Sequence, residues 1–226
     1  MSKINSLTDE QISQNREKFI SLLKEIKRQY ADIDALITKL DKSDFFTAPC
    51  STAYHCAFKG GLCFHSLHVY EQLKKLVEIE YPNPNHGCSD NGEIYEIDDY
   101  VCPISQDSIL ITSLLHDISK MNFYETSTRN VKDENGNWKQ VPFIKTRDAK
   151  DRFVYSTHGV NSEYMVGRFI PLTLEESVAI IQHMGGKEAG APVMDSIVTE
   201  AFNRFPLAVL LHTADMLATF LDEALE

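Results

Sequence analysis

The 226-residue chain lacks several features that would each assign it to a class of protein. Its cysteines form no C-x-x-C pair and number five, which argues against a disulfide framework and against a cysteine-type zinc site. No apolar signal core follows Met1, and no apolar run is long enough to span a bilayer. Basic residues are also few, since 22 stand against 33 acidic ones, for a net charge of -11. These absences predict a cytoplasmic globular protein that binds no membrane, and they disfavour long nucleic acid as a partner.

Apolar residues instead recur at helical spacing along most of the chain, which predicts an all-α fold. Thr8 and Gln11 form a capping-box signature ahead of a helix over 8–30, and a short helix over 32–40 follows. We expect these two helices to form an N-terminal extension (1–44) to a domain over 45–226. They either cover its core, which is the commoner role, or pair with a second subunit in a homo-oligomer.

Further helices are expected over 62–78, from about 105 to 120, from His158 for a dozen residues, from 173 to 183, near 193–203 and from Pro206 onward. The segment 81–104 is expected to be a surface loop. One β-hairpin is predicted within 121–157, because apolar residues flank the Asp133-Glu134-Asn135-Gly136 turn. The hairpin is either a substrate lid or an insertion without a role. Its candidates for contacting a base or phosphate are Tyr124, Arg147 and Arg152.

Several charged or titratable residues interrupt the apolar faces of these helices. His116 and Asp117 end a nearly all-apolar run, where each needs a partner if it is buried. Lys120 follows His116 by one helical turn. Asp215 lies on or beside the buried face of the last helix, with His212 one turn earlier as a residue that would orient it.

His65 shares a face with Leu62 and Val69, and His68 lies one turn further on, where it would line the same pocket. His158 opens one helix and His183 ends another. Taken alone, His65 is more readily explained as a hydrogen-bonded core residue. Together, four histidines and two aspartates match the ligands of one or two divalent transition-metal ions, such as Mn, Fe, Co, Ni or Zn. The members of this set are His65, His116, Asp117, His158, His183 and Asp215.

Three strings in the chain resemble the motifs of the HD superfamily of metal-dependent phosphohydrolases. Gly60-Gly61-Leu62 with His65-Ser66-Leu67 resembles its first motif, LLHDISK its second, and Ala214-Asp215-Met216-Leu217 its last. The resemblance covers most of 45–226 and is nearest to the exoribonuclease-like and cyclic-dinucleotide-like branches, in which added histidines hold a second metal. Ser119 stands where the family often has glycine, and we expect it to be backbone context only.

The resemblance implies that His65, His116, Asp117 and Asp215 hold one metal, and that Asp117 bridges to a second held by His158 and His183. Metal-activated water would then attack phosphorus, with Asp117 and Lys120 as catalytic residues and Lys120 against a phosphate oxygen. Expected substrate contacts are Lys120, His68, Tyr124, Arg147 and Arg152. The favoured function is hydrolysis of a small nucleotide, either a phosphomonoester or a triphosphate.

Three alternatives stay open at this point. One is a phosphodiesterase or 3′-to-5′ exonuclease that acts on a cyclic nucleotide or short nucleic acid. Another is a nucleotide- or metal-sensing regulatory module without activity. The last is a helical domain whose histidines are buried by chance.

Overall fold

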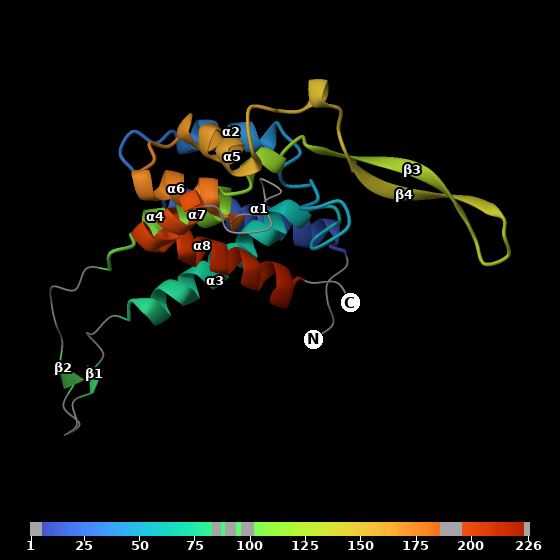
Figure 1. Ribbon diagram of the computed structural model, residues 1–226. Coiled ribbons are helices and arrows are strands. Elements are labelled where there is room, and N and C mark those ends of the chain that lie inside the picture. Colours follow the sequence, from blue (N-terminus) through green and yellow to red (C-terminus); the bar gives the residue numbers. More distant parts are fainter. Residues whose placement is uncertain (1–5, 83–86, 89–93, 96–101, 186–195, 224–226) are drawn as a thin grey trace.

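The computed structural model describes residues 6–82, 87–88, 94–95, 102–185 and 196–223, most of which are helical (Figure 1). The α-helices in this part of the chain are α1 (Asp9–Lys24), α2 (Ile33–Asp41), α3 (Gly61–Glu80), α4 (Gln106–Leu115), α5 (His158–Gly167), α6 (Leu174–Gln182), α7 (Ser196–Arg204) and α8 (Pro206–Leu217). A π-helical turn, Ala218–Asp222, continues α8. The mostly helical class predicted from apolar spacing is therefore confirmed.

The first helix begins as predicted but ends earlier. Thr8 and Gln11 form both hydrogen bonds of the capping box. Helix α1 stops at Lys24, not at residue 30 as predicted. Tyr30 adopts a left-handed backbone conformation with φ of 64° and is 84% exposed. A residue in that conformation cannot continue a right-handed helix.

Both N-terminal helices contribute to the same core as the later helices. Phe19 and Leu23 of α1 and Leu36 and Leu40 of α2 are fully buried and pack into the cluster that contains Leu62 and Leu115. Covering the core, which was the commoner of the two expected roles, is thus what these helices do.

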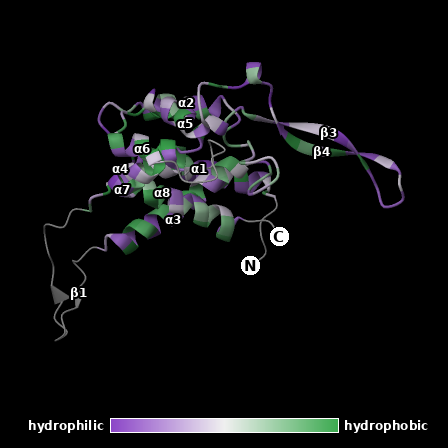
Figure 2. Cartoon of the chain, viewed as in Figure 1, coloured by the Kyte–Doolittle hydropathy of each residue, from purple (hydrophilic) through white to green (hydrophobic). Residues whose placement is uncertain are grey.

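Helix α4 is the most deeply buried helix in the described structure. Each of its residues from Ile109 to Leu115 is buried, as expected for a helix that is apolar on most faces. Helix α3 packs against α4 and α8, and α6 packs against α8 and α5. Apolar colour runs along these helices in Figure 2, as expected when each turns one face to a shared core.

No single described helix is long and apolar enough to cross a membrane, although the bent pair Ser196–Arg204 and Pro206–Asp222 passes on length and composition together.

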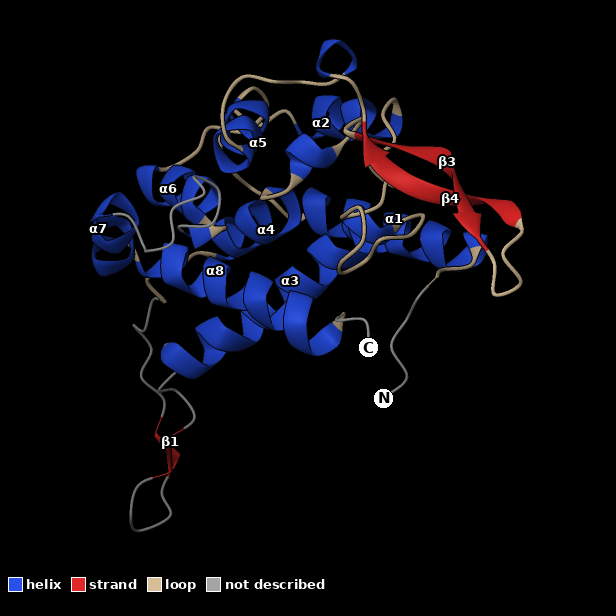
Figure 3. Cartoon of the chain, turned by 45° about the vertical axis from the view of Figure 1, so that its right-hand side comes forward, coloured by secondary structure: helices blue, strands red, loops and turns tan. Residues whose placement is uncertain are grey.

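The predicted hairpin is present as β3 (Tyr124–Lys132) and β4 (Trp138–Thr146), which pair antiparallel from Tyr124–Thr146 to Lys132–Trp138. Asp133 closes the turn by accepting hydrogen bonds from the Asn135 and Asn137 amides. The strands extend away from the helical body (Figures 1 and 3). Residues 147–157 lie outside the strands, and include only a short 3₁₀ turn, Ala149–Asp151.

The segment 81–104, expected to be a surface loop, is described only in part. Its described residues include two short paired strands, β1 (Gly87–Cys88) and β2 (Ile94–Tyr95), which the loop prediction did not include. The rest of that prediction lies outside the described residues. The pair Gly185-Gly186 after α6 is typical of a helix end. Gly186 also lies outside the described residues, while Gly185 has φ of 60°.

A buried carboxylate joins three parts of the helical body. Glu176, the third residue of α6, accepts two hydrogen bonds from the Arg28 guanidinium at 2.9 and 2.6 Å. It also accepts one from the Ser108 hydroxyl of α4 at 2.7 Å, and its side chain completes the capping box with Thr173. Burial alone would raise the pKa of Glu176, but these hydrogen bonds lower it below 4.5.

We expect Glu176→Gln to lower the free energy of unfolding by about 2 kcal/mol, because the guanidinium would lose a charged partner inside the protein. Urea denaturation measures this loss. Glu71→Gln is the matched control, since Glu71 pairs with Lys18 on the surface and should change stability by less than about 0.5 kcal/mol. Because the folded-state pKa of Glu176 is lowered, its contribution is present above about pH 4.5 and disappears as the pH falls through that lowered value. Equal losses in the two variants would contradict this role.

Candidate metal centre

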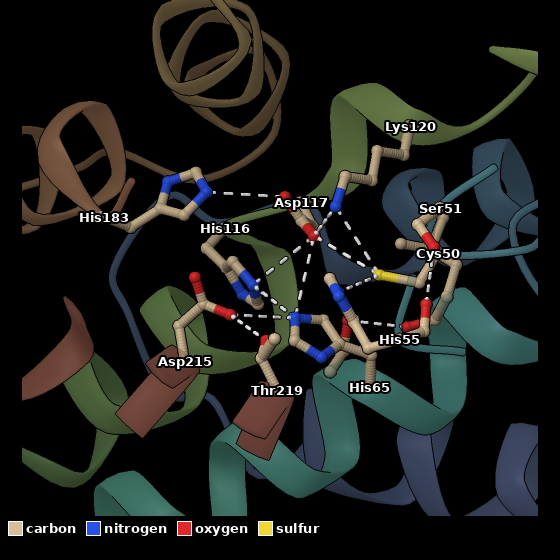
Figure 4. A network of polar contacts seen from close by, with 12 residues as sticks. Cys50, Ser51, His55, His65, His116, Asp117, Lys120, His183, Asp215 and Thr219 are labelled. Atoms are coloured by element: carbon tan, nitrogen blue, oxygen red, sulfur yellow. Dashed lines mark hydrogen bonds and ion pairs between the residues drawn. The ribbon is translucent and has the colours of Figure 1, made fainter. Parts of the chain in front are cut away.

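Five segments that are distant in sequence deliver six of the predicted residues to one buried place. His65 comes from α3, His116 and Asp117 from the end of α4, and Asp215 from α8. His158 begins α5, and His183 follows α6 directly. We call the four histidines around Asp117 the histidine cluster (Figure 4 labels all but His158). His65, His116 and His183 are fully buried, and Asp117 is 2% exposed.

The two oxygens of Asp117 face two different groups of ligand atoms. Its Oδ2 lies 3.7 Å from His65 Nε2 and 3.6 Å from His116 Nε2. Its Oδ1 contacts His158 Nε2 and lies 3.4 Å from His183 Nε2. Each set of three atoms is close enough to hold one metal ion. Asp215 Oδ1 lies 3.2 Å from His65 Nε2 and thus extends the first set.

Two of the histidines are held by the same local device at a helix end. His116 and His183 cap the C-termini of α4 and α6, and their backbone conformations are nearly identical. The Nδ1 of His116 lies 2.8 Å from the Ser113 carbonyl, and that of His183 lies 2.7 Å from the Ile180 carbonyl. Since a carbonyl only accepts, Nδ1 must carry the proton in both rings, and this leaves the Nε2 lone pair free.

The other two rings are oriented by side chains. His65 donates Nδ1–H to Glu223 Oε2 at 2.9 Å, since a carboxylate also only accepts. His158 Nδ1 lies 2.7 Å from the Ser119 hydroxyl, which also accepts a hydrogen bond from Ser162 at 3.0 Å. Ser119 therefore positions His158, and the expectation that it is backbone context only was wrong. All four Nε2 atoms consequently point inward to Asp117, as metal-binding histidines require.

The inward-facing nitrogens of His116 and His183 lack a suitable protein partner. His116 Nε2 and His65 Nε2 lie 3.3 Å apart, although each ring already carries its proton on Nδ1. His183 Nε2 is buried and makes no hydrogen bond in the described structure. Facing lone pairs repel each other unless a cation or an extra proton lies between them. The donor set therefore fits one or two metal ions, and nitrogen-rich sites of this kind favour borderline transition metals over Mg²⁺.

The pKa shifts show how strongly the site responds to charge. Burial lowers the pKa of His116 to about 3, so that ring is neutral. Burial opposes the charged form of His65 too, but the carboxylates of Glu223 and Asp215 raise its pKa well above 6.5. Burial would raise the pKa of Asp117, but Lys120 and His158 lower it well below 3.8.

Lys120 lies beside the cluster, though not by the helical spacing expected. Helix α4 ends at Leu115, and Lys120 ends a 3₁₀ turn (Ile118–Lys120). Its Nζ lies 2.6 Å from Asp117 Oδ2, and its side chain is largely buried. Lys120 and Asp117 both line a cavity of about 610 Å³ beside the cluster.

The cavity has a polar floor and a wall that is mostly apolar. His183 and Asp215 line the floor with Asp117 and Lys120. The remaining lining residues are Ala53, Tyr54, His55, Met184, His212, Met216, Thr219 and Phe220. None of these comes from the hairpin, so the described structure gives no support to the expectation of a lid.

Three predicted contacts turn out to have other partners. His68 Nδ1 pairs with Glu223 at 2.8 Å, and His68 does not line the cavity. Arg147 donates to the Tyr124 carbonyl and pairs with Asp44, while Arg152 donates to the Arg147 carbonyl. The two arginines lie at the base of the hairpin, and the expected contacts of His68, Arg147 and Arg152 with substrate stay predictions.

Two further expectations need correction or refinement. His212 was expected to orient Asp215, but its Nδ1 bonds the His183 carbonyl at 2.6 Å and so helps to fix the segment that carries His183. Asp215 is instead approached by Thr219, whose hydroxyl donates to Oδ1 at 3.3 Å. Burial raises the pKa of Tyr124, and the charge of the nearby Lys120 ammonium opposes this rise.

Three residues at the site were not predicted from the sequence. Glu223 lies beyond α8 and is 3% exposed. Cys50 and His55 belong to the loop before α3, with Cys50 Sγ 3.7 Å from Asp117 Oδ2 and 3.5 Å from Lys120 Nζ. Burial lowers the pKa of His55 to about 4. No periodicity marks these positions, because they lie outside regular helices.

Comparison of the chain with protein-family models, with curated proteins and with solved structures finds no match. The assignment of a function therefore depends on the geometry of the site and on the resemblance of its motifs.

We expect Glu223→Gln to weaken divalent-metal binding about 10- to 100-fold, because the amide cannot accept from both His65 and His68 as the carboxylate does. Titration calorimetry with Mn²⁺ measures the change. The neighbouring Asp222→Asn is the matched control. In the described structure, the Asp222 side chain accepts a hydrogen bond from Gln72 at an exposed position. If both variants bound Mn²⁺ like the parent protein, Glu223 would have no part in positioning the ligand.

Proposed function

We propose that this chain is an HD-type metal-dependent phosphohydrolase that acts on a small nucleotide. The observation that carries the proposal is the orientation of four histidine Nε2 atoms around the two oxygens of one buried aspartate. A regulatory module needs a binding pocket. It does not need a carboxylate with histidine nitrogens facing both of its oxygens and a lysine beside it. The motifs around His65, His116-Asp117 and Asp215 support the same family.

The residues have separable roles in this proposal. His65, His116, Asp117 and Asp215 would hold one ion, and Asp117, His158 and His183 a second. When bound, such ions acidify water and bind phosphate oxygens. Lys120 would stabilise charge that develops on a non-bridging phosphate oxygen, and its contact with Asp117 holds its ammonium at the cavity floor.

The cavity supports a nucleotide over a simple phosphate ester. Its volume of about 610 Å³ lies in the range of small-molecule sites, which is roughly 300–1,000 Å³. The phosphate would lie at the floor beside Lys120. Tyr54, Met216 and Phe220 would provide an apolar wall for the base and sugar.

We expect the Mn²⁺-loaded protein to release phosphate or pyrophosphate from at least one member of a panel of nucleoside mono- and triphosphates. His116→Ala and Asp117→Ala should each lower the rate about a thousandfold, because losing a metal ion removes several kcal/mol of transition-state stabilisation. Asp41→Asn is the control, since it alters only an exposed pair with Arg16. Ribose 5-phosphate in the same panel tests whether the base is needed. Activity that survives both alanine substitutions would refute the assignment, and tight nucleotide binding without turnover would favour a sensor.

A second candidate substrate, a short single-stranded oligonucleotide, is favoured by one group of exposed aromatic residues. Phe153 and Tyr164 stack nearly parallel at 12° with ring centroids 5.8 Å apart. Tyr155 lies 5.3 Å from Tyr164 and is 66% exposed. The guanidinium of Arg168, which caps the C-terminus of α5, lies over the Tyr164 ring. Exposed aromatic rings with an arginine are a typical surface for stacking bases. The group also flanks His158, which begins the same helix.

If oligonucleotides are hydrolysed, Tyr155→Ala should raise the KM for an oligonucleotide about tenfold or more, since each base stacked on an aromatic ring contributes roughly 1–3 kcal/mol. The KM for a mononucleotide should not change, because Tyr155 does not line the cavity. Steady-state kinetics on a pair of such substrates measures both values. An equal effect on the two substrates would argue that Tyr155 acts on the fold and not on the strand.

A further inference from the structure

The loop 50–56 is closed by internal hydrogen bonds and lies beside the histidine cluster. The Cys50 amide donates to the Cys56 carbonyl at 3.0 Å and so closes the loop. Inside it, Ser51 Oγ donates to the His55 carbonyl at 2.7 Å and accepts from the Tyr54 amide at 3.1 Å. These bonds bring the backbone of Cys50 and His55 close together, and the Cys50 Sγ contacts His55 Nε2.

The same loop is fixed against the start of α3. A Cβ on Gly61 would lie 2.0 Å from the Cys56 carbonyl oxygen, so only glycine permits this close approach. Helix α3 carries His65 one turn later. The Gly60-Gly61 pair thus sets the position of the loop relative to His65, in addition to starting the helix.

This arrangement brings together a third set of possible ligand atoms. Cys50 Sγ lies 3.5 Å from His55 Nε2, and the His55 and His65 rings lie 4.9 Å apart. The sulfur and one nitrogen of each ring all lie within 4.8 Å of one another. Figure 4 shows Cys50 and His55 on the side of Asp117 opposite His183. His55 also lines the cavity, so an ion here has a path from solvent and a position open to water.

This third set shares His65 with the first metal position. The Nδ1 of His65 is committed to Glu223, and its Nε2 has one lone pair. That lone pair lies 3.3 Å from His116 Nε2 on the first position. It can bind an ion held with His116 and Asp117 or an ion held with Cys50 and His55, but not both at once.

We propose that Cys50, His55 and His65 form an inhibitory site for a thiophilic divalent cation such as Zn²⁺ or Cd²⁺. Binding converts the Cys50 thiol to a metal-bound thiolate and releases its proton to solvent. A thiolate favours Zn²⁺ and Cd²⁺ over Mn²⁺ or Mg²⁺, so the site selects ions by softness. Occupation withdraws His65 from the first position. The inhibitory effect rests on the proposed function, whereas metal binding by the thiolate does not.

Cobalt spectroscopy tests the binding directly. Co²⁺ added to the protein is expected to produce the near-ultraviolet absorption of a thiolate-to-cobalt transition, because Co²⁺ accepts the same ligands as Zn²⁺. Cys50→Ser should abolish this band, and His55→Gln should lower the Co²⁺ affinity of the band at least about tenfold. Cys63→Ser is the matched control, since Cys63 is equally buried but belongs to no ligand set. Circular dichroism establishes that each variant is folded. No band in the parent protein, or a band that persists in Cys50→Ser, would overturn the proposal.

Inhibition provides the second measurement. Zn²⁺ added to the Mn²⁺-loaded protein should inhibit hydrolysis of its best substrate, and Cys50→Ser should raise the half-inhibitory Zn²⁺ concentration at least about tenfold. An unchanged value would show that Zn²⁺ acts elsewhere and would refute the inhibitory role. The two proposals fail separately. Absence of turnover on any substrate with a normal cobalt band would refute the proposed function only, whereas turnover without the band would refute this site only.

Discussion

The structure of the site depends on hydrogen bonds that fix a proton on Nδ1 of its histidines. Carbonyl groups hold this proton on His116 and His183, and the Glu223 carboxylate holds it on His65. Each bond turns an Nε2 lone pair inward to Asp117. These hydrogen bonds satisfy the ring N–H groups but leave the Nε2 lone pairs facing a centre with little positive charge. A bound cation is the simplest means of compensating for this shortage of positive charge.

Helix ends supply most of this geometry. A helix leaves its last carbonyl groups without partners, and a histidine just past the end can donate to one of them. His116 and His183 do this on two different helices, each bonding the carbonyl three residues earlier. The ring is thereby fixed by the helix itself, and its Nε2 is left to face Asp117. Because α4 and α6 both end near Asp117, one local rule places two ligands.

The sequence predicted those parts of the site that break a helical pattern. His65 and Asp215 were recognised because they lie on otherwise apolar faces, and His116 and Asp117 because they end an apolar run. Cys50, His55 and Glu223 do not stand out in the sequence, since they lie outside regular helices and have no periodicity to break. The role of Ser119 does not follow from the sequence, because only the fold shows that it faces His158. Helix starts were also predicted more closely than ends: Thr8 marks where α1 begins, whereas Tyr30 lies beyond it on the surface.

Charge connects the metal centre to the proposed substrate. The chain carries a formal net charge of -11, which repels a phosphate group at long range. Lys120 cannot reverse this alone, because its ammonium lies 2.6 Å from the Asp117 carboxylate. Metal ions bound by the histidine cluster would neutralise Asp117 and Asp215, so that the charge of Lys120 would become available to a phosphate oxygen. Phosphate binding and metal binding would then be coupled. In the two proposals, His65 can bind an ion at only one of two metal positions. The position that is occupied would decide whether the charge of Lys120 becomes available at the cavity floor.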